Sequence, residues 1–154
     1  MSFEMHVDTI KYGDEISEKY TCSGQNISPE IKWKDAPSST KEIVLFMDDP
    51  DAPRKSFNHW CMRNIQSSVG TIHENVPIAE KTDEGWIQLK NDFGKNGYGG
   101  PCPPGKKTHK YTVTLYALVR PLNESETVNR ESMRKLCETL MVKKVTWMFT
   151  YGKK

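Results

Sequence analysis

Apolar and polar residues alternate along two long segments of the chain. Between Tyr111 and Val119 every second residue is apolar, and the residues between them are threonines and large side chains. The segment from Val145 to Tyr151 repeats this arrangement near the end of the sequence. Successive side chains of a β-strand point to opposite faces, so each segment is predicted to be a strand covered on both faces. We expect both strands in the centre of a sheet.

Four shorter segments complete the predicted strands: Phe3–Val7, Ile31–Trp33, Ile43–Met47 and Phe57–Ile65. The run from Ile43 to Met47 is wholly apolar, which is typical of a buried strand, and Phe57–Ile65 is its expected neighbour. The other two segments are expected to be short edge strands. Glycine and proline separate the segments, as they do in turns.

One segment has helical periodicity. Apolar residues recur at spacings of three and four: Met133, Leu136, Cys137, Leu140 and Met141. Asn129 is a suitable N-cap and Glu131 falls in the first turn. We expect this helix on the edge of the sheet. Scattered strands with a single late helix favour an antiparallel β-sandwich over a parallel α/β sheet.

Length and charge limit the class of protein. A chain of 154 residues suits one domain, here residues 1–154. Apolar residues make up 36% of the chain and aromatic residues 10%, which favours a folded domain over a disordered one. The formal charge is only +2, so the chain lacks the large single-sign field of a nucleic-acid or membrane-surface binder. We therefore expect no nucleic-acid partner.

The expected location is the cytoplasm. The first residues lack the basic and apolar regions of a secretory signal. The longest apolar runs are far shorter than the ~20 residues of a transmembrane helix. Four cysteines are widely spaced (Cys22, Cys61, Cys102 and Cys137), which is unlike a zinc site or a redox Cys-x-x-Cys motif. We expect free or buried thiols. A disulfide is the alternative if a targeting segment precedes this sequence in the native protein.

Carboxylates and prolines cluster directly after the buried strand. The sequence from Asp48 to Pro53 reads Asp-Asp-Pro-Asp-Ala-Pro, and His59 follows at the start of the next strand. Two prolines three positions apart make a rigid, non-helical corner that aims the neighbouring carboxylates. Such a corner suits a binding site. The alternative is purely structural, with Asp49 and Asp51 forming turns with backbone amides.

A second cluster precedes the strongest predicted strand. Residues 93–105 contain five glycines and three prolines. Glycine permits close approach of the backbone to a ligand, and proline fixes the course of the loop. His109 lies where this loop enters the strand, a common position for a functional side chain, although a lone histidine is often structural.

These motifs together resemble a known family. The sequence has Asp-Pro-Asp-Ala-Pro at 49–53, His-Trp at 59–60, Gly-Gly-Pro-Cys-Pro-Pro at 99–104 and His-Lys-Tyr at 109–111. In this order they resemble the phosphatidylethanolamine-binding protein (PEBP) family, specifically its bacterial and archaeal, Raf kinase inhibitor-like branch. The stretch from Tyr20 to Trp33 is also similar to that branch. The resemblance extends from about residue 3 to Gly152.

The resemblance implies a mainly β fold, an antiparallel Greek-key β-sandwich of PEBP-like type with a C-terminal helix. It also implies a shallow pocket for phosphate-like groups, such as phospholipid heads, nucleotides or phosphorylated partners. Motif matching gives its ligand-binding residues as Asp49, Asp51, Pro53, His59, Gly100, Pro101, Pro103, His109 and Tyr111. The loop from Pro101 to Pro104 is matched only as a region. Lys110 replaces the usual arginine of the family, which keeps the charge without the planar fork.

The carboxylates of this pocket should repel a phosphate unless nearby donors compensate. The candidate donors are His59, His109, Tyr111 and loop amides. Our hypothesis is that a carboxylate orients one ring nitrogen of a histidine while the other nitrogen, protonated, faces the anion. Anion binding should then strengthen as the pH falls.

The sequence also has features of other functional classes. Asp49-x-Asp51 after a buried strand is also typical of haloacid dehalogenase-type phosphohydrolases that use Mg²⁺, but Pro53 and the lack of strand-helix alternation argue against them. The sequence therefore predicts no enzyme and no cofactor or metal. Relatives that inhibit kinases or proteases suggest a protein-interaction role without a small ligand. The resemblance also suggests a homodimer.

Overall fold

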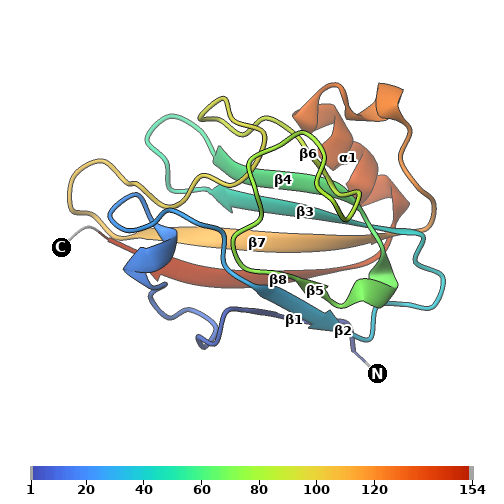
Figure 1. The fold of residues 1–154 in the computed structure, drawn as a ribbon, viewed down its shortest axis with the longest axis horizontal. Coiled ribbons are helices and arrows are strands. Elements are labelled where there is room, and N and C mark those ends of the chain that lie inside the picture. Colours follow the sequence, from blue (N-terminus) through green and yellow to red (C-terminus); the bar gives the residue numbers. More distant parts are fainter. Residues whose placement is uncertain (1, 153–154) are drawn as a thin grey trace.

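The computed structural model describes residues 2–152 and shows two antiparallel sheets stacked on each other, with one α-helix outside them (Figure 1). In chain order the elements are β1 (Glu4–Val7), η1 (Glu18–Tyr20), β2 (Ile31–Lys34), β3 (Glu42–Asp49), β4 (Phe57–Ile65), η2 (Ser67–Val69), β5 (Thr71–Ile72), β6 (Ile87–Gln88), β7 (His109–Leu118), η3 (Glu124–Thr127), α1 (Arg130–Leu140) and β8 (Met141–Tyr151). The expected β-sandwich with a C-terminal helix is confirmed. None of the helices within the described residues is long and apolar enough to cross a membrane.

The larger sheet has five strands in the order β6-β4-β3-β7-β8. All eight residues of β3 are buried, as the apolar run from Ile43 to Met47 predicted. The expected pairing with β4 is confirmed, and β7 is the neighbour on the other side. The prediction that the last strand is central is wrong, because β8 is the edge strand of this sheet, next to β7. Residues 13–16 cover one end of that edge, where the Ile16 amide donates to the Thr150 carbonyl at 2.9 Å.

The smaller sheet has three strands in the order β1-β2-β5. β1 is an edge strand, as expected. The prediction of an edge for Ile31–Trp33 is wrong, because β2 lies between β1 and β5. The short β5 strand has only two residues, too few to give an alternation that can be recognised in the sequence. The sequence pattern therefore could not predict β5, the third strand of this sheet.

The two faces of the large sheet pack against different layers, which explains the continuous apolar run in β3. Ile43, Leu45 and Met47 face the small sheet and join the larger apolar core, together with Val113 and Leu115 of β7. Burying such side chains fully stabilises the fold by about 1.5–3 kcal/mol each. Both faces of β3 are covered, so both sets of its positions from Ile43 to Met47 are apolar, whereas β7 carries Thr112 and Thr114 on the face opposite Val113 and Leu115.

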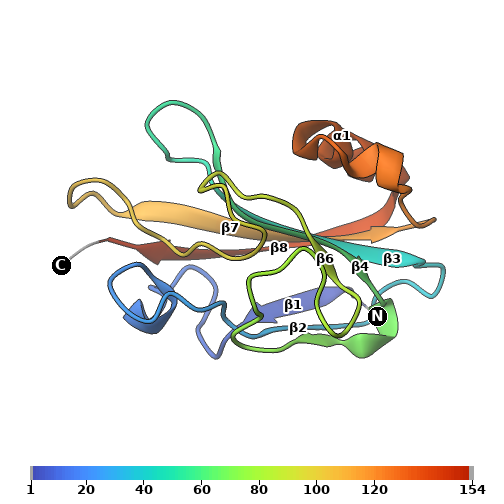
Figure 2. The ribbon, with the colours of Figure 1, turned by 45° about the horizontal axis from the view of Figure 1, so that its top comes forward.

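The helix α1 covers the opposite face of the large sheet (Figure 2). Met133 and Cys137 of α1 pack against Val44 and Phe46 of β3 in a second, smaller core. The helix was expected on the sheet edge, and that prediction is wrong. The helical period identifies the apolar stripe but not the layer that it contacts. The N-cap prediction is confirmed, since the Asn129 side chain accepts a hydrogen bond from the Ser132 amide at 2.9 Å.

A disulfide joins Cys22 to Cys102 across 80 positions of the sequence. The expectation of free thiols is therefore wrong for this pair and confirmed for Cys61 and Cys137, which are buried. Sequence spacing did not reveal the bond because the fold alone brings the two loops together. The Cys22 amide also donates to the Pro101 carbonyl at 3.1 Å, so the loop after η1 is fastened to the Gly- and Pro-rich loop.

Candidate functional site

The two loops singled out in the sequence meet at one end of the large sheet. β3 ends at Asp49, β4 begins at Phe57 and β7 begins at His109. These strands are antiparallel neighbours, with Asp49 opposite Phe57 and Asp48 opposite Thr112. Their ends consequently lie side by side, and both loops leave the sheet on the left in Figure 1.

A buried hydrogen bond connects the two loops. His109 Nδ1 lies 2.6 Å from the Asp49 carboxylate, and both side chains are buried. A carboxylate only accepts here, so Nδ1 carries the proton and Nε2 is left for another partner. The other Asp49 oxygen accepts the Asp51 amide at 2.8 Å. Asp49 therefore fixes both the imidazole orientation and the turn of the proline corner.

A β-bulge in β4 aims His59 at the same place. Met47 pairs with Trp60, whereas Asp48 pairs with Asn58, so His59 is an extra residue without a partner in β3. In a regular strand, His59 and Trp60 would point to opposite faces. A bulge relaxes this rule and often redirects a side chain beside a functional site. His59 and Trp60 accordingly share the face toward the small sheet.

The His59 ring is held from one side. Its Nδ1 lies 2.6 Å from the Gly99 carbonyl oxygen, which can only accept, so Nδ1 is the protonated nitrogen. Burial lowers the pKa of His59, and the Gly99 carbonyl and the Asp49 carboxylate only partly oppose this effect. At neutral pH the ring is uncharged, with Nε2 as a hydrogen-bond acceptor.

Eleven residues surround a pocket of about 200 Å³, which we call the histidine pocket. They are Asp49, Ala52, Pro53, Phe57, His59, Phe93, Cys102, Pro103, Pro104, His109 and Tyr111. Phe57 and Phe93 lie edge-on to the His59 ring, with centroid distances of 5.0 and 5.3 Å. Aromatic rings and prolines thus form most of the wall, and the Asp49–His109 pair and His59 supply its polar groups.

Tyr111 adds an unused donor. Its side chain is fully buried and lines the histidine pocket, and its hydroxyl has no hydrogen-bond partner among residues 2–152. Burial, followed by the charge of Asp49, raises the pKa of Tyr111, so the hydroxyl keeps its proton. A buried donor without a partner costs about 1–3 kcal/mol, which a ligand oxygen would offset.

Six of the nine residues assigned by motif matching line this pocket: Asp49, Pro53, His59, Pro103, His109 and Tyr111. The other three, Asp51, Gly100 and Pro101, do not. The Asp51 carboxylate instead accepts the Lys110 amide at 2.8 Å. Gly100 and Pro101 are buried against the loop after η1, where the Gly100 amide donates to Asn26 Oδ1 at 2.8 Å. Their closeness to the loop backbone makes them scaffold residues.

Gly100→Ala should destabilise the protein by about 2–3 kcal/mol, because its Cβ would lie 2.1 Å from the Tyr20 carbonyl oxygen and 2.5 Å from Asn26 Oδ1. Urea denaturation measures this loss. Gly105→Ala is the control: nothing lies within 4 Å of its Cβ, and its φ of +69° costs only about 1 kcal/mol. Equal losses in the two variants would contradict the scaffold role of Gly100.

Phe57, Phe93, Ala52, Cys102 and Pro104 were not assigned individually from the sequence. Phe57 was identified only as the start of a strand and Phe93 as the start of a loop. Both rings are partly or largely exposed, and Phe93 is 46% exposed. Proximity to two histidine motifs was the available signal, since large apolar side chains commonly line ligand pockets.

A known protein family matches almost the whole chain. The family model described as phosphatidylethanolamine-binding protein matches residues 6–152. The chain belongs to the phosphatidylethanolamine-binding protein family. A UPF0098 protein of Aquifex aeolicus is 46% identical over 116 residues, covering 75% of this chain and 67% of its own. A UPF0098 protein of Methanothermobacter thermautotrophicus is 39% identical and covers 87% of this chain and 89% of its own.

Solved structures show the same PEBP fold. A PEBP homologue from Chlamydia trachomatis superposes with a TM-score of 0.87 at 30% sequence identity. E. coli YbcL, described as a member of the mammalian PEBP family, superposes with a TM-score of 0.85 at 26% identity. In both comparisons the match covers 99% of each chain. The full length of the described sandwich, including its C-terminal helix, is therefore shared with bacterial PEBP homologues.

Proposed function

We propose that this protein binds small ligands by holding a phosphate-like anionic group in the histidine pocket. The observation that carries the proposal is the Asp49–His109 pair at 2.6 Å, which fixes one ring nitrogen and leaves the other for a ligand. His59 is held in the same way by Gly99. A phospholipid head, a nucleotide or a phosphorylated protein carries the required group. The pocket volume of about 200 Å³ suits the anionic group more than a whole lipid or nucleotide.

Binding of the anion is coupled to a proton. With Nδ1 donating to a fixed acceptor, a neutral His59 offers only a lone pair at Nε2, which repels an anion. Protonation turns Nε2 into a donor. Since burial lowers the pKa of His59, the free protein resists this protonation, and a bound anion favours it. Tyr111 needs no such change because its hydroxyl already carries a proton.

We predict that sulfate and inorganic phosphate bind more tightly as the pH falls from about 8 to 5.5, by up to tenfold per pH unit. The measurement is isothermal titration calorimetry with either anion in buffers of different ionisation enthalpy, which also counts the protons taken up. Sulfate is the sharper probe because it keeps its charge over this range. An affinity for sulfate that does not change with pH would rule out the protonated-histidine mechanism.

The lowered pKa of His59 also makes the stability of the unliganded protein depend on pH, with stability falling as anion affinity rises. The pKa of His59 is lower in the folded than in the unfolded state, so the unfolded state binds the proton first. The contribution of His59 to stability is therefore present above pH ~6.5 and declines as the pH falls below it. An anion that binds the protonated ring should restore the lost stability.

A non-enzymatic role is part of the proposal. The alternative metal-dependent phosphohydrolase requires Asp49 as nucleophile and Asp51 as acid or base. Here one Asp49 oxygen accepts from the His109 ring and the other from the Asp51 amide. Asp51 in turn accepts the Lys110 amide. Both carboxylates thus have structural partners, which supports binding over turnover. If the protein hydrolyses a phosphomonoester and His109→Ala abolishes that activity, the enzyme hypothesis is favoured instead.

Regulation of a kinase or protease remains a candidate role, either through the histidine pocket or through a protein surface that needs no small ligand. If phosphate competes with such a partner, the partner binds through the histidine pocket. If it does not compete, the partner binds through another surface. The cytoplasmic location and the homodimer stay predictions. Disulfides persist mainly in oxidising compartments, so the Cys22–Cys102 bond argues against a reducing cytoplasm.

A further inference from the structure

A second pocket lies on the opposite face of the same strand ends. It has a volume of about 320 Å³ and lies beside the start of α1, and we call it the arginine pocket. Its lining residues are Asp48, Pro50, Lys55, Ser56, Asn58, Asp92, Thr112, Arg130, Glu131 and Arg134. This volume is within the range of about 300–1,000 Å³ that is usual for small-ligand sites. None of these residues lines the histidine pocket.

Buried oxygen atoms form one part of the arginine pocket. Asp48 and Asn58 are only 7% and 3% exposed. The Asn58 amide nitrogen donates to the Asp48 carboxylate at 3.0 Å, but Asn58 Oδ1 receives no hydrogen bond from any residue in 2–152. Thr112 and Ser56 contribute hydroxyl-bearing side chains. This part of the pocket therefore offers acceptors to a ligand that carries N–H donors, and one of these acceptors is otherwise unused.

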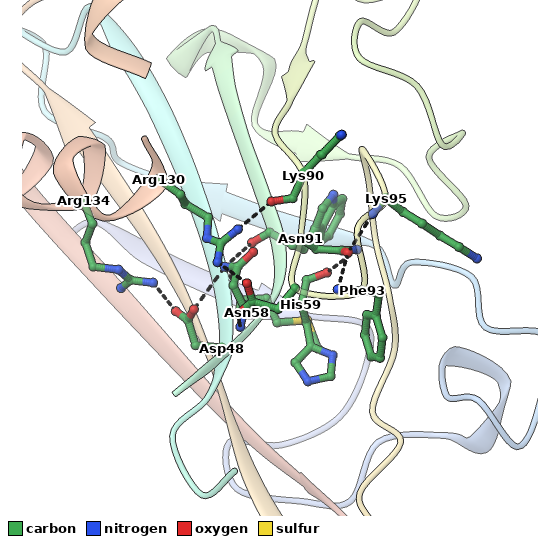
Figure 3. Close-up of polar contacts among 12 residues, drawn as sticks. Asp48, Asn58, His59, Lys90, Asn91, Phe93, Lys95, Arg130 and Arg134 are labelled. Atoms are coloured by element: carbon green, nitrogen blue, oxygen red, sulfur yellow. Dashed lines mark hydrogen bonds and ion pairs between the residues drawn. The ribbon is translucent and has the colours of Figure 1, made fainter. Parts of the chain in front are cut away.

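Two arginines on successive turns of α1 form the other part, and Figure 3 shows Arg134 directed at Asp48 and Arg130 directed at Lys90. Arg130 donates to the Lys90 carbonyl at 2.6 Å and to the Asp92 carboxylate. Arg134 donates to Asp48. A guanidinium has five N–H donors, so each arginine retains donors for a ligand oxygen.

The charges of the arginine pocket balance. Three basic residues (Lys55, Arg130 and Arg134) face three acidic residues (Asp48, Asp92 and Glu131). A simple anion would compete with Asp48 and Asp92 for the arginines, and a simple cation would compete with the arginines for the carboxylates. A ligand with one charge of each sign satisfies both parts without breaking an existing pair. Planar carboxylates also match the fork of a guanidinium.

We propose that the arginine pocket binds a small zwitterion of the amino-acid class. The ligand carboxylate lies against the free N–H groups of Arg130 and Arg134, and its ammonium group lies against Asp48 and Asn58. The proposal goes beyond anion binding in the histidine pocket and needs neither His59 nor His109. The two sites are nonetheless neighbours, since Figure 3 shows His59 and Phe93 on the far side of the strands from the arginines.

The test is a titration of ¹⁵N-labelled protein with L-alanine, followed by the side-chain NMR signals of Asn58, Arg130 and Arg134. Acetate and ethylammonium serve as probes that carry one charge each. We expect saturable shifts of these signals with alanine at millimolar concentrations, and binding of each single-charge probe weaker by about tenfold or more. Arg134→Gln should weaken alanine binding by a similar factor. Arg54→Gln, in the loop between β3 and β4 but outside both pockets, should leave it unchanged.

Arg134→Gln removes the partner of a buried carboxylate, so its folding is checked by thermal denaturation. If it unfolds, Lys55→Gln replaces it, because Lys55 is exposed and its loss should weaken binding about threefold without loss of the fold. Absence of saturation, equal binding of acetate, or alanine shifts confined to His59 and Phe93 would each overturn the proposal. None of these results bears on phosphate binding, which is measured separately in the histidine pocket.

Discussion

Asp49→Ala is expected to lower the free energy of unfolding by about 3 kcal/mol or more and to remove measurable phosphate binding. The Asp49 side chain is only 6% exposed and accepts from His109 and from the Asp51 amide. Removing one partner of a buried pair typically costs about 3–5 kcal/mol, because the other partner stays buried without compensation. The ring of His109 would also lose the acceptor that orients it. Urea denaturation and calorimetry with sulfate measure the two effects.

Asp51→Ala is the matched control in the same proline corner. Asp51 is exposed and accepts one hydrogen bond, from the Lys110 amide at 2.8 Å, so its loss should cost about 1 kcal/mol or less. Both variants remove one negative charge at the same end of the sheet. If they lose stability and sulfate affinity equally, overall charge rather than the Asp49–His109 contact controls the site.

Replacing both Cys22 and Cys102 with serine should lower the free energy of unfolding by roughly 4 kcal/mol. The disulfide spans 80 positions, and constraint of the unfolded chain increases with the size of the closed loop. Cys102 also lines the histidine pocket, so sulfate binding should weaken as its loop loosens. Chemical denaturation with and without a thiol reductant gives the measurement.

The reductant provides the internal control for this prediction. It should destabilise the wild-type protein to the level of the double serine variant and leave that variant unchanged. Both cysteines are exposed, so the reductant reaches them without unfolding of the core. A wild-type protein that keeps its full stability under reducing conditions would show that the bond contributes little.

The strands were predictable because their signal is local. Alternation from Tyr111 onward and the apolar run from Ile43 depend only on which faces are covered, and the sequence records both. The order of strands within each sheet depends on pairing between distant segments. This is why β8 and β2 were assigned to the wrong positions and α1 was expected at the edge. The disulfide was missed for the same reason.

The structure brings six of the nine residues assigned by motif matching to one pocket, because their chemistry is concentrated in short motifs. The proline corner and the segments around the two histidines are uncommon motifs, and proline makes the corner rigid. The sequence therefore predicted that the two loops line one pocket. Phe93 carries no such signal, because a single exposed aromatic residue is ordinary in a loop. The arginine pocket was missed because α1 contributes Arg130 and Arg134, and only the fold places this helix over the acidic side chains of β3 and the loop after β6.

The β-bulge at His59 determines which substitutions in β4 the sheet can tolerate. A one-residue shift normally exchanges the two faces of an entire strand, which would expose the core. Here the shift begins at His59, beyond the last core position at Trp60, and reverses only residues 57–59. The core-forming residues of β4 therefore begin at Trp60, and the pocket-lining residues come before it. Phe57 and His59 both line the histidine pocket, so substitutions there can alter that pocket while the strand from Trp60 onward keeps its register.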